Sequence, residues 1–419
     1  MGTPAIPRRL AFTAGAQQLI NWGISFYMPG TFAGAIAADK GWSSPQIYLG
    51  LTLAMLIMAA VSPLVARLLA RFGGRLVVTS GTLLIAASCA MMAWSPSLVG
   101  WYGAWLLTGV GMRLSLYDAL FAAVVNLYGQ QARKTISQIT LAGGLASALF
   151  WPLGEALLTV MSWQDALRVY ALFGLLSAWL SYQLPRQRLG SSTKAKAPTA
   201  DGDRRNGIRY ALFIALITFI STGTSTHLPE FISHFGLPVA IGMLWGFGQT
   251  GARLGEVLAG RRITPLALTR FTALAMPLCF LLGVSSTAYA GCAAGFVLGY
   301  GAINGLVTIV KATLPLALFS AESYASRTGL LLIPGQLMAA AAPFTYAWLN
   351  HRLGIVGGMW ISTGLTLIVA GLALAMARSV GKTEPDKRPA LCPGQNVGRL
   401  NICRNHKRVH SPGTQETTQ

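Results

Sequence analysis

The sequence predicts an all-helical membrane protein in which twelve transmembrane helices form two bundles of six. Of its 419 residues, 53% are hydrophobic and only 11% are charged. Uncharged stretches such as 10–38 and 42–66 exceed the roughly 20 apolar residues that cross a bilayer. Soluble chains carry about a quarter of their residues as charged side chains. The charge content is therefore too low for a water-soluble fold of this length.

The first half of the chain contains six expected spans. The first follows Arg8 and Arg9 and lacks the short apolar core and cleavage site of a signal peptide, so a retained span is expected. Ser95-Pro96-Ser97 divides a long uncharged stretch into the third and fourth spans. These residues, 1–185, form the predicted N-terminal bundle. Its spans are 12–37, 45–66, 76–94, 98–125, 136–161 and 169–184.

The second half repeats this organisation after a polar segment. Residues 186–209 are rich in Ser, Thr, Lys and Arg, which is typical of a flexible linker, here expected on the cytoplasmic side. The C-terminal bundle is predicted over 210–377. Its spans are 210–235, 239–259, 271–284, 289–314, 329–349 and 355–377. The polar tail, 378–419, is predicted to be disordered, and its few Cys and His residues match only a fragment of a zinc-finger pattern.

Basic residues predict which helix ends face the cytoplasm, because Lys and Arg collect in cytoplasmic loops. With the N-terminus inside, the outer loops hold only Lys40, Arg168 and Arg352, whereas the inner loops hold most of the others. Both termini are therefore predicted to be cytoplasmic, with the protein in a cell membrane, the inner membrane in a bacterium. The same bias accounts for the net charge of +20, so no nucleic-acid partner is expected.

Short Gly and Pro motifs recur in the same order in both halves. Their shared order predicts two halves related by an axis along the membrane normal, a known transporter architecture. The paired motifs are Tyr27-Met28-Pro29 with His227-Leu228-Pro229, Gly109-Val110-Gly111 with Gly299-Tyr300-Gly301, and Pro152 with Pro343.

After the second span the chain reads Ala66-Arg67-Leu68-Leu69-Ala70-Arg71-Phe72-Gly73-Gly74-Arg75. This stretch resembles the signature Gly-x-Leu-Ala-Asp-Arg-x-Gly-Arg-Arg of the major facilitator superfamily. Leu68, Arg71, Gly73 and Arg75 match, whereas Ala70 replaces the acid. The resemblance implies the major facilitator fold, secondary transport by alternating access, and a gating role for Arg71, Gly73 and Arg75. An ordinary basic cytoplasmic turn explains these residues equally well.

Ionisable side chains inside spans mark substrate pathways, because they are costly to place in hydrocarbon. Arg113 and Asp118 lie in the fourth span, five residues and therefore roughly 140° apart on a helix, so no direct pair is expected. Arg113 is thus predicted to be an unpaired cation. Arg253 and Glu256 in the eighth span are three residues apart and are expected to pair, for function or merely for structure.

Two arginines within the spans predict an organic anion as substrate, for example a monocarboxylate. Asp118 or Glu256 would take up a proton or exchange arginine partners. An arginine in the eighth span is similar to that of monocarboxylate and oxalate–formate carriers, where it binds the carboxylate. The complete predicted substrate site is Arg113, Arg253, Tyr27, Tyr117, Gln249 and Asn304. Glu155, His227, Glu230 and Lys311 lie nearer span ends and are expected to pack or to reach the interface.

Other functions are less compatible with these residues. Proton-driven export of a drug or toxic compound is the alternative within transport. No phosphate-binding Gly-x4-Gly-Lys-[Ser/Thr] loop is present, and no catalytic constellation is found, so neither direct ATP drive nor an enzyme is expected. The expected partners are a small-molecule substrate, a proton or other coupling ion, and membrane lipid. No cofactor or metal is predicted, and a monomer is expected.

Overall fold

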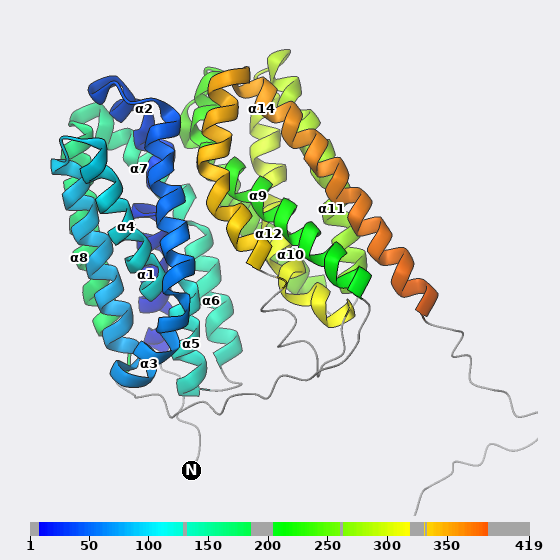
Figure 1. The fold of residues 1–419 in the computed structure, drawn as a ribbon, viewed down its shortest axis with the longest axis horizontal. Helices are drawn as coiled ribbons and strands as arrows, with labels where there is room; N and C mark the ends of the chain where they lie inside the picture. Colours follow the sequence, from blue (N-terminus) through cyan, green and yellow to red (C-terminus); the bar gives the residue numbers. More distant parts are fainter. Residues whose placement is uncertain are drawn as a thin grey trace, which may run out of the picture.

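The computed structural model describes residues 8–128, 132–185, 204–259, 263–318, 331 and 333–383, and these residues fold into helices arranged as two bundles side by side (Figure 1). The first bundle contains α1 (Arg8–Ile24), α2 (Met28–Lys40), α3 (Ser44–Trp94), α4 (Leu98–Ser115), α5 (Tyr117–Tyr128), α6 (Ala132–Gly144), α7 (Ala146–Val160) and α8 (Trp163–Tyr182). The second contains α9 (Arg204–His234), η2 (Val239–Gly242), α10 (Met243–Ala259), α11 (Pro265–Val284), η4 (Ser285–Thr287), α12 (Gly291–Leu318) and α14 (Ile333–Thr383).

Helices of membrane-spanning length dominate the described residues. Among them, 8 helical segments are long and apolar enough to cross a membrane. One of these, Ile333–Ser379, has 47 residues and contains both the eleventh and the twelfth expected spans. The first, sixth and eighth expected spans fall outside this group. For the first and eighth the reason is length, because α1 and α10 have only 17 residues each.

Three expected spans are interrupted, which corrects the prediction of continuous helices. The first breaks at 25–27, the fourth at Leu116 and the fifth at Leu145. Pro29 explains the first break, because proline has no N–H to continue the hydrogen-bond ladder. The N–H of Tyr27 instead reaches the carbonyl of Trp22 at 3.1 Å. The fifth span breaks directly after Gly143-Gly144, and glycine is a poor residue for a helix interior.

At two other places, a pair of expected spans is joined into one element by a glycine kink. The second and third meet in α3 at Gly73 (φ 78°), and the eleventh and twelfth meet in α14 at Gly354 (φ 71°). A left-handed backbone costs an ordinary residue roughly 1–2 kcal/mol, so glycine suits both positions. The kink between the second and third spans therefore lies at Gly73, within the stretch that resembles the family signature. The described residues of the predicted linker are 204–209 and begin α9, and those of the predicted tail are 378–383 and end α14.

Small residues set the distance between neighbouring helices. A Cβ on Gly109 of α4 would lie 2.3 Å from the carbonyl oxygen of Ala54 in α3. In the second half, a Cβ on Gly301 of α12 would lie 2.5 Å from the carbonyl oxygen of Trp245 in α10. Close backbone approach at small residues is a common way to pack helices in a membrane. The paired Gly-x-Gly motifs thus make comparable contacts, which supports the expected duplication.

The two bundles meet mainly near one end. We call the end with Arg8 and Thr383 the termini face and the opposite end the distal face (Figure 1). Near the distal face, the Tyr48 hydroxyl donates to the Thr226 carbonyl at 3.2 Å, and the Phe344 N–H donates to Thr52 Oγ1 at 3.3 Å. Both bonds link the first half to the second. We call this contact region the seam.

Candidate functional site

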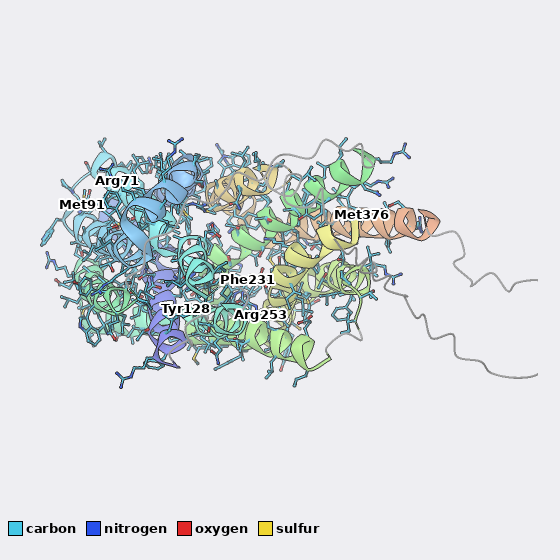
Figure 2. All side chains as sticks on the ribbon, turned by 90° about the horizontal axis from the view of Figure 1, so that it is seen from below. Arg71, Met91, Tyr128, Phe231, Arg253 and Met376 are labelled. Atoms are coloured by element: carbon cyan, nitrogen blue, oxygen red, sulfur yellow. The ribbon has the colours of Figure 1, made fainter. Side chains whose placement is uncertain are left out.

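Arg253 lies at the boundary between the two bundles (Figure 2). Its Nη1 donates to the carbonyl of Thr140 in α6 at 3.3 Å, and its buried Nε has no partner. Among the described residues no acid lies within 4.0 Å of its guanidinium, so the expected ion pair with Glu256 is wrong. The missing side chain at Gly144 explains the difference, because a Cβ there would lie 3.2 Å from Nη1. The arginine therefore reaches across to the first half.

Aromatic rings of the first half surround this position. Tyr27 packs edge-on against Trp151 with ring centroids 5.4 Å apart, and Trp22 lies 5.3 Å from Tyr117. The Tyr117 hydroxyl and the Arg253 Nη1 lie against two neighbouring glycines, because a Cβ on Gly143 would be 2.1 Å from the hydroxyl and a Cβ on Gly144 3.2 Å from Nη1. The Tyr27 ring lies 6.4 Å from that of Trp22, which joins the two tyrosines. The structure thus brings three of the predicted site residues together, namely Tyr27, Tyr117 and Arg253.

Gln249 and Asn304 extend the site within the second half. Gln249 is only 4% exposed and lies one helical turn from Arg253. A Cβ on Gly305 of α12 would lie 2.6 Å from the Gln249 carbonyl oxygen, so the neighbouring Asn304 is in the same layer. The Asn304 side chain accepts a hydrogen bond from Ser221. Both predicted residues therefore belong to this central region.

The central region leaves several hydrogen-bond donors without partners. These are the indole N–H groups of Trp22 and Trp151, the Arg253 Nε and the hydroxyl of Thr250. Indole and guanidinium groups donate and do not accept. Orphaned indoles also occur elsewhere in the described structure, so the grouping of these donors around one arginine is what distinguishes the centre. Such a site suits a ligand that supplies acceptor oxygens.

Arg113 and Asp118 form an ion pair, which contradicts the expected unpaired cation. The prediction assumed one continuous helix, on which the two side chains diverge. The backbone breaks instead at Leu116 (ψ −172°), between α4 and α5, and this break brings the two side chains together. Asp118 is 68% exposed, whereas Arg113 is 21% exposed. Arg113 is therefore neutralised in this conformation, and its role in binding substrate stays a prediction.

A double-mutant cycle is expected to detect this pair. Arg113→Ala, Asp118→Ala and the double variant should give a coupling free energy of about 0.2–1 kcal/mol, because exposed pairs contribute little. Thermal unfolding in detergent measures it. A parallel cycle of Arg113→Ala with Asp165→Ala should give no coupling, since Asp165 pairs with Arg168 on α8. Equal coupling in both cycles would contradict the interpretation.

The predicted gating residues lie on the termini side of the first bundle. Arg75 stacks its guanidinium 3.6 Å from the ring centroid of Tyr182, whereas Arg71 is exposed and lies over Phe72. Gly73 supplies the kink between them. Arg75 thus contacts a ring of its own bundle and not the second bundle. A gating role for Arg71, Gly73 and Arg75 stays a prediction.

Sequence reasoning missed a buried histidine at the seam. His227 is 3% exposed, and its Nδ1 lies 2.9 Å from the carboxylate of Glu230. Its Nε2 lies 2.9 Å from the Pro343 carbonyl oxygen, and its ring lies 4.0 Å from that of Tyr48. His227 therefore packs within the seam, as expected, and in addition it makes two polar contacts that were not expected. The three-residue spacing of His227 and Glu230 was the available signal, but only the fold adds Tyr48 and Pro343.

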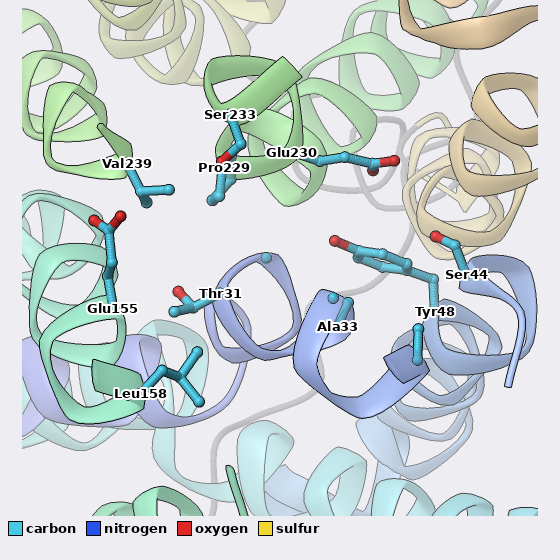
Figure 3. Close-up of a pocket in the computed structure, with 13 residues that line it drawn as sticks. Thr31, Ala33, Ser44, Tyr48, Glu155, Leu158, Pro229, Glu230, Ser233 and Val239 are labelled. Carbon is cyan, nitrogen blue, oxygen red and sulfur yellow. The ribbon is translucent and has the colours of Figure 1, made fainter. Parts of the chain in front are cut away.

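A pocket of about 390 Å³ lies beside this histidine, toward the distal face (Figure 3). Residues of both bundles line it, and Glu155 and Glu230 are its acidic side chains. Thr31, Tyr48 and Ser233 add hydroxyl groups. The pocket therefore holds two acids and several hydroxyls in a largely apolar lining, on a chain that is strongly basic overall.

Two helical bundles with a donor-rich centre between them define a membrane transporter rather than an enzyme. The sequence model of the Major Facilitator Superfamily matches residues 18–343, and the chain belongs to this family. It is a multi-pass membrane protein with a small-molecule substrate, and the family and its fold support secondary transport. The resemblance that the sequence showed is thereby confirmed.

Solved structures share the fold at low sequence identity. A bacterial homologue of the human lysosomal transporter Spinster, inward-facing and unoccupied, has a TM-score of 0.67 and 13% identity, covering 92% of this chain and 100% of its own. A mutant of the nucleoside transporter NupG has a TM-score of 0.68 and 12% identity, covering 89% of this chain and 99% of its own. At these identities the likeness shows the fold alone. No curated protein matches the sequence.

Proposed function

We propose that the protein carries a small organic anion, such as a monocarboxylate, by alternating access coupled to protons, and that Arg253 binds the anion. One observation carries the proposal. Arg253 is a partly buried cation between the halves with no acid in ion-pair reach among the described residues and with a buried Nε that lacks a partner. An entering carboxylate would neutralise the Arg253 charge and accept the hydrogen bond that its Nε lacks.

The geometry of the guanidinium suits this ligand. Its planar fork binds a carboxylate through two parallel hydrogen bonds, and charged partners make these bonds roughly twice as strong as neutral ones. The indole N–H groups of Trp22 and Trp151 and the amide of Gln249 offer further donors. The rings of Tyr27 and Tyr117 would pack on the organic part of the substrate.

Proton coupling is proposed through the Arg113–Asp118 pair. Protonation of Asp118 would remove the negative charge that holds Arg113, and the freed guanidinium would then become a second cation for the substrate. Asp118 is exposed enough to exchange protons with water. Glu256 is partly buried and forms no ion pair with Arg253 within the described ranges, so it stays a second candidate for the proton.

We further propose that the termini face is cytoplasmic. Arg67, Arg71 and Arg75 lie on this side of α3, and the positive-inside rule places such clusters in the cytoplasm. In a bacterium the membrane would be the inner one. The protein is proposed to act as a monomer, because each chain provides both halves of the site.

Uptake into vesicles tests the function. Purified protein in liposomes is expected to accumulate radiolabelled lactate or pyruvate, and more so when the pH is lower outside than inside. Liposomes without protein provide the control. A chain that moves neither carboxylates nor other organic anions would contradict the proposal.

The aromatic rings also support the alternative, export of a drug or toxic compound. Trp22, Tyr27, Tyr117 and Trp151 lie together, and each aromatic contact with a flat ligand contributes roughly 0.5–1.5 kcal/mol. Such a ligand would not require Arg253. Transport of a dye such as ethidium against a pH gradient, without transport of carboxylates, would favour this alternative.

A further inference from the structure

We propose that His227 and Glu230 form a proton-binding site at the seam, and that the bound proton holds the distal face closed. The proposal concerns the equilibrium between conformations in the absence of substrate. It therefore goes beyond the proposed anion transport and does not depend on the identity of the substrate. It also places a proton away from Asp118 and Glu256, the residues that the sequence suggests.

The hydrogen bonds around His227 determine how many protons the pair holds. Nε2 faces the Pro343 carbonyl oxygen at 2.9 Å, and a carbonyl only accepts, so Nε2 carries a hydrogen. Nδ1 faces a Glu230 carboxylate oxygen at 2.9 Å. Neutral His227 beside ionised Glu230 would place two lone pairs against each other. The contact therefore requires one more proton, either on Nδ1 or on the Glu230 carboxylate.

The surroundings of His227 favour that extra proton. The titratable groups that face the ring are Tyr48 of α3, Tyr346 of α14 and Glu230 of its own helix, and Glu155 of α7 lines the same pocket as Glu230. None of them is a cation, so none repels an imidazolium. The Tyr48 ring, with its centroid 4.0 Å from that of the imidazole, attracts a positive charge through its face.

The proton stabilises contact between the halves because Tyr48 belongs to the first bundle and His227 to the second. The Tyr48 hydroxyl also donates to the Thr226 carbonyl at 3.2 Å, beside the histidine. Opening of the distal face would withdraw the Tyr48 ring and expose the pair to water. A proton that binds the closed state more tightly than the open state shifts the equilibrium toward the closed state.

The proton exchanges with solvent on the distal side. Glu230 is 37% exposed and lines the pocket of about 390 Å³ beside the seam (Figure 3). Water in this pocket reaches the carboxylate without crossing the packed residues of the seam. Acidification on the distal side would therefore close that side, and opening of the site toward the other side would follow.

Distances between spin labels test this proposal in the full chain without substrate. Ala38→Cys on α2 and Arg352→Cys on α14 place labels on exposed distal positions of the two halves, with the natural cysteines replaced by serine. Between pH 5 and pH 9 the closed, short-distance population is expected to fall as the pH rises. The ratio of closed to open should change by at most about tenfold per pH unit, the limit for one proton.

Two variants and a matched control complete the test. His227→Gln cannot take the proton and should abolish the pH response. Glu230→Gln should stay closed at every pH, because its amide donates to Nδ1 of a neutral histidine while Nε2 donates to Pro343. His234→Gln, an exposed histidine on the same helix, should respond like the wild type. A wild type without pH response, or a full response in either seam variant, would overturn the proposal. Loss of anion uptake with an intact pH response would refute the proposed function alone.

Discussion

Arg253→Ala is expected to lower substrate uptake by about 100-fold or more while the protein stays folded and inserted. Hydrogen bonds to charged groups contribute about 1.5–3 kcal/mol each, and the variant removes a two-point contact with the carboxylate. Every 1.4 kcal/mol corresponds to a factor of ten in affinity. The fold should tolerate the change, because within the described structure Arg253 leaves no buried acid behind and loses one bond, to the Thr140 carbonyl.

Two further variants separate charge from geometry. Arg253→Lys keeps the positive charge but loses the planar fork, so uptake should recover only in part. Arg168→Ala removes an exposed arginine that pairs with Asp165 at the distal end of α8, and it should transport normally. Uptake per amount of reconstituted protein and the thermal unfolding midpoint are the two measurements. Normal uptake by Arg253→Ala would remove the main support for an anion site.

The architecture was accessible from the sequence because the bilayer restricts the possible folds so strongly. Long uncharged stretches must become helices in hydrocarbon, since no water is available for unpaired backbone groups. The residues that the structure gathers at the centre could also be predicted from the sequence. They include Tyr27, Gln249 and Arg253. They are polar side chains in apolar spans, and such side chains rarely face lipid.

The pairing of charged residues could not be predicted from the sequence, because it depends on where the helices break. Sequence spacing places Arg113 and Asp118 on different faces of one ideal helix, yet the break at Leu116 brings them together. Spacing also favours a bond between Arg253 and Glu256. Tertiary structure decides otherwise, since Gly144 leaves room for the arginine to reach α6. Helical-wheel arguments hold only within an unbroken helix.

The role of His227 at the seam could not be predicted from the sequence, for a different reason. His227 and Glu230 come from one helix, but the Tyr48 ring and the Pro343 carbonyl come from positions far away in the sequence. A backbone carbonyl leaves no trace in the sequence, because every residue has one. The proton count at this histidine therefore depends on a contact that only the folded chain shows.

Gly109→Leu is expected to cause the largest loss of stability among the variants considered, because it forces two packed helices apart. A Cβ on Gly109 would lie 2.0 Å from the Ile57 side chain and 2.3 Å from the carbonyl oxygen of Ala54. The isoleucine could change rotamer, but the carbonyl belongs to the backbone of α3 and cannot turn aside. Overpacking typically costs about 1–3 kcal/mol, and a rigid backbone neighbour places this case at or above the upper end.

Gly103→Leu is the matched control, since Gly103 lies on the same helix, α4, and a Cβ there meets no atom within 4 Å. Leucine forms helices better than glycine by about 0.8 kcal/mol, so this variant should be neutral or slightly stabilised. The thermal unfolding midpoint in detergent and the monodisperse fraction after size-exclusion chromatography measure both variants. Equal midpoints for the two would contradict the close approach of α4 to α3. A large deficit confined to Gly109→Leu would instead tie the first Gly-x-Gly motif to helix packing, a role that the contact between Gly301 and Trp245 extends to the second half.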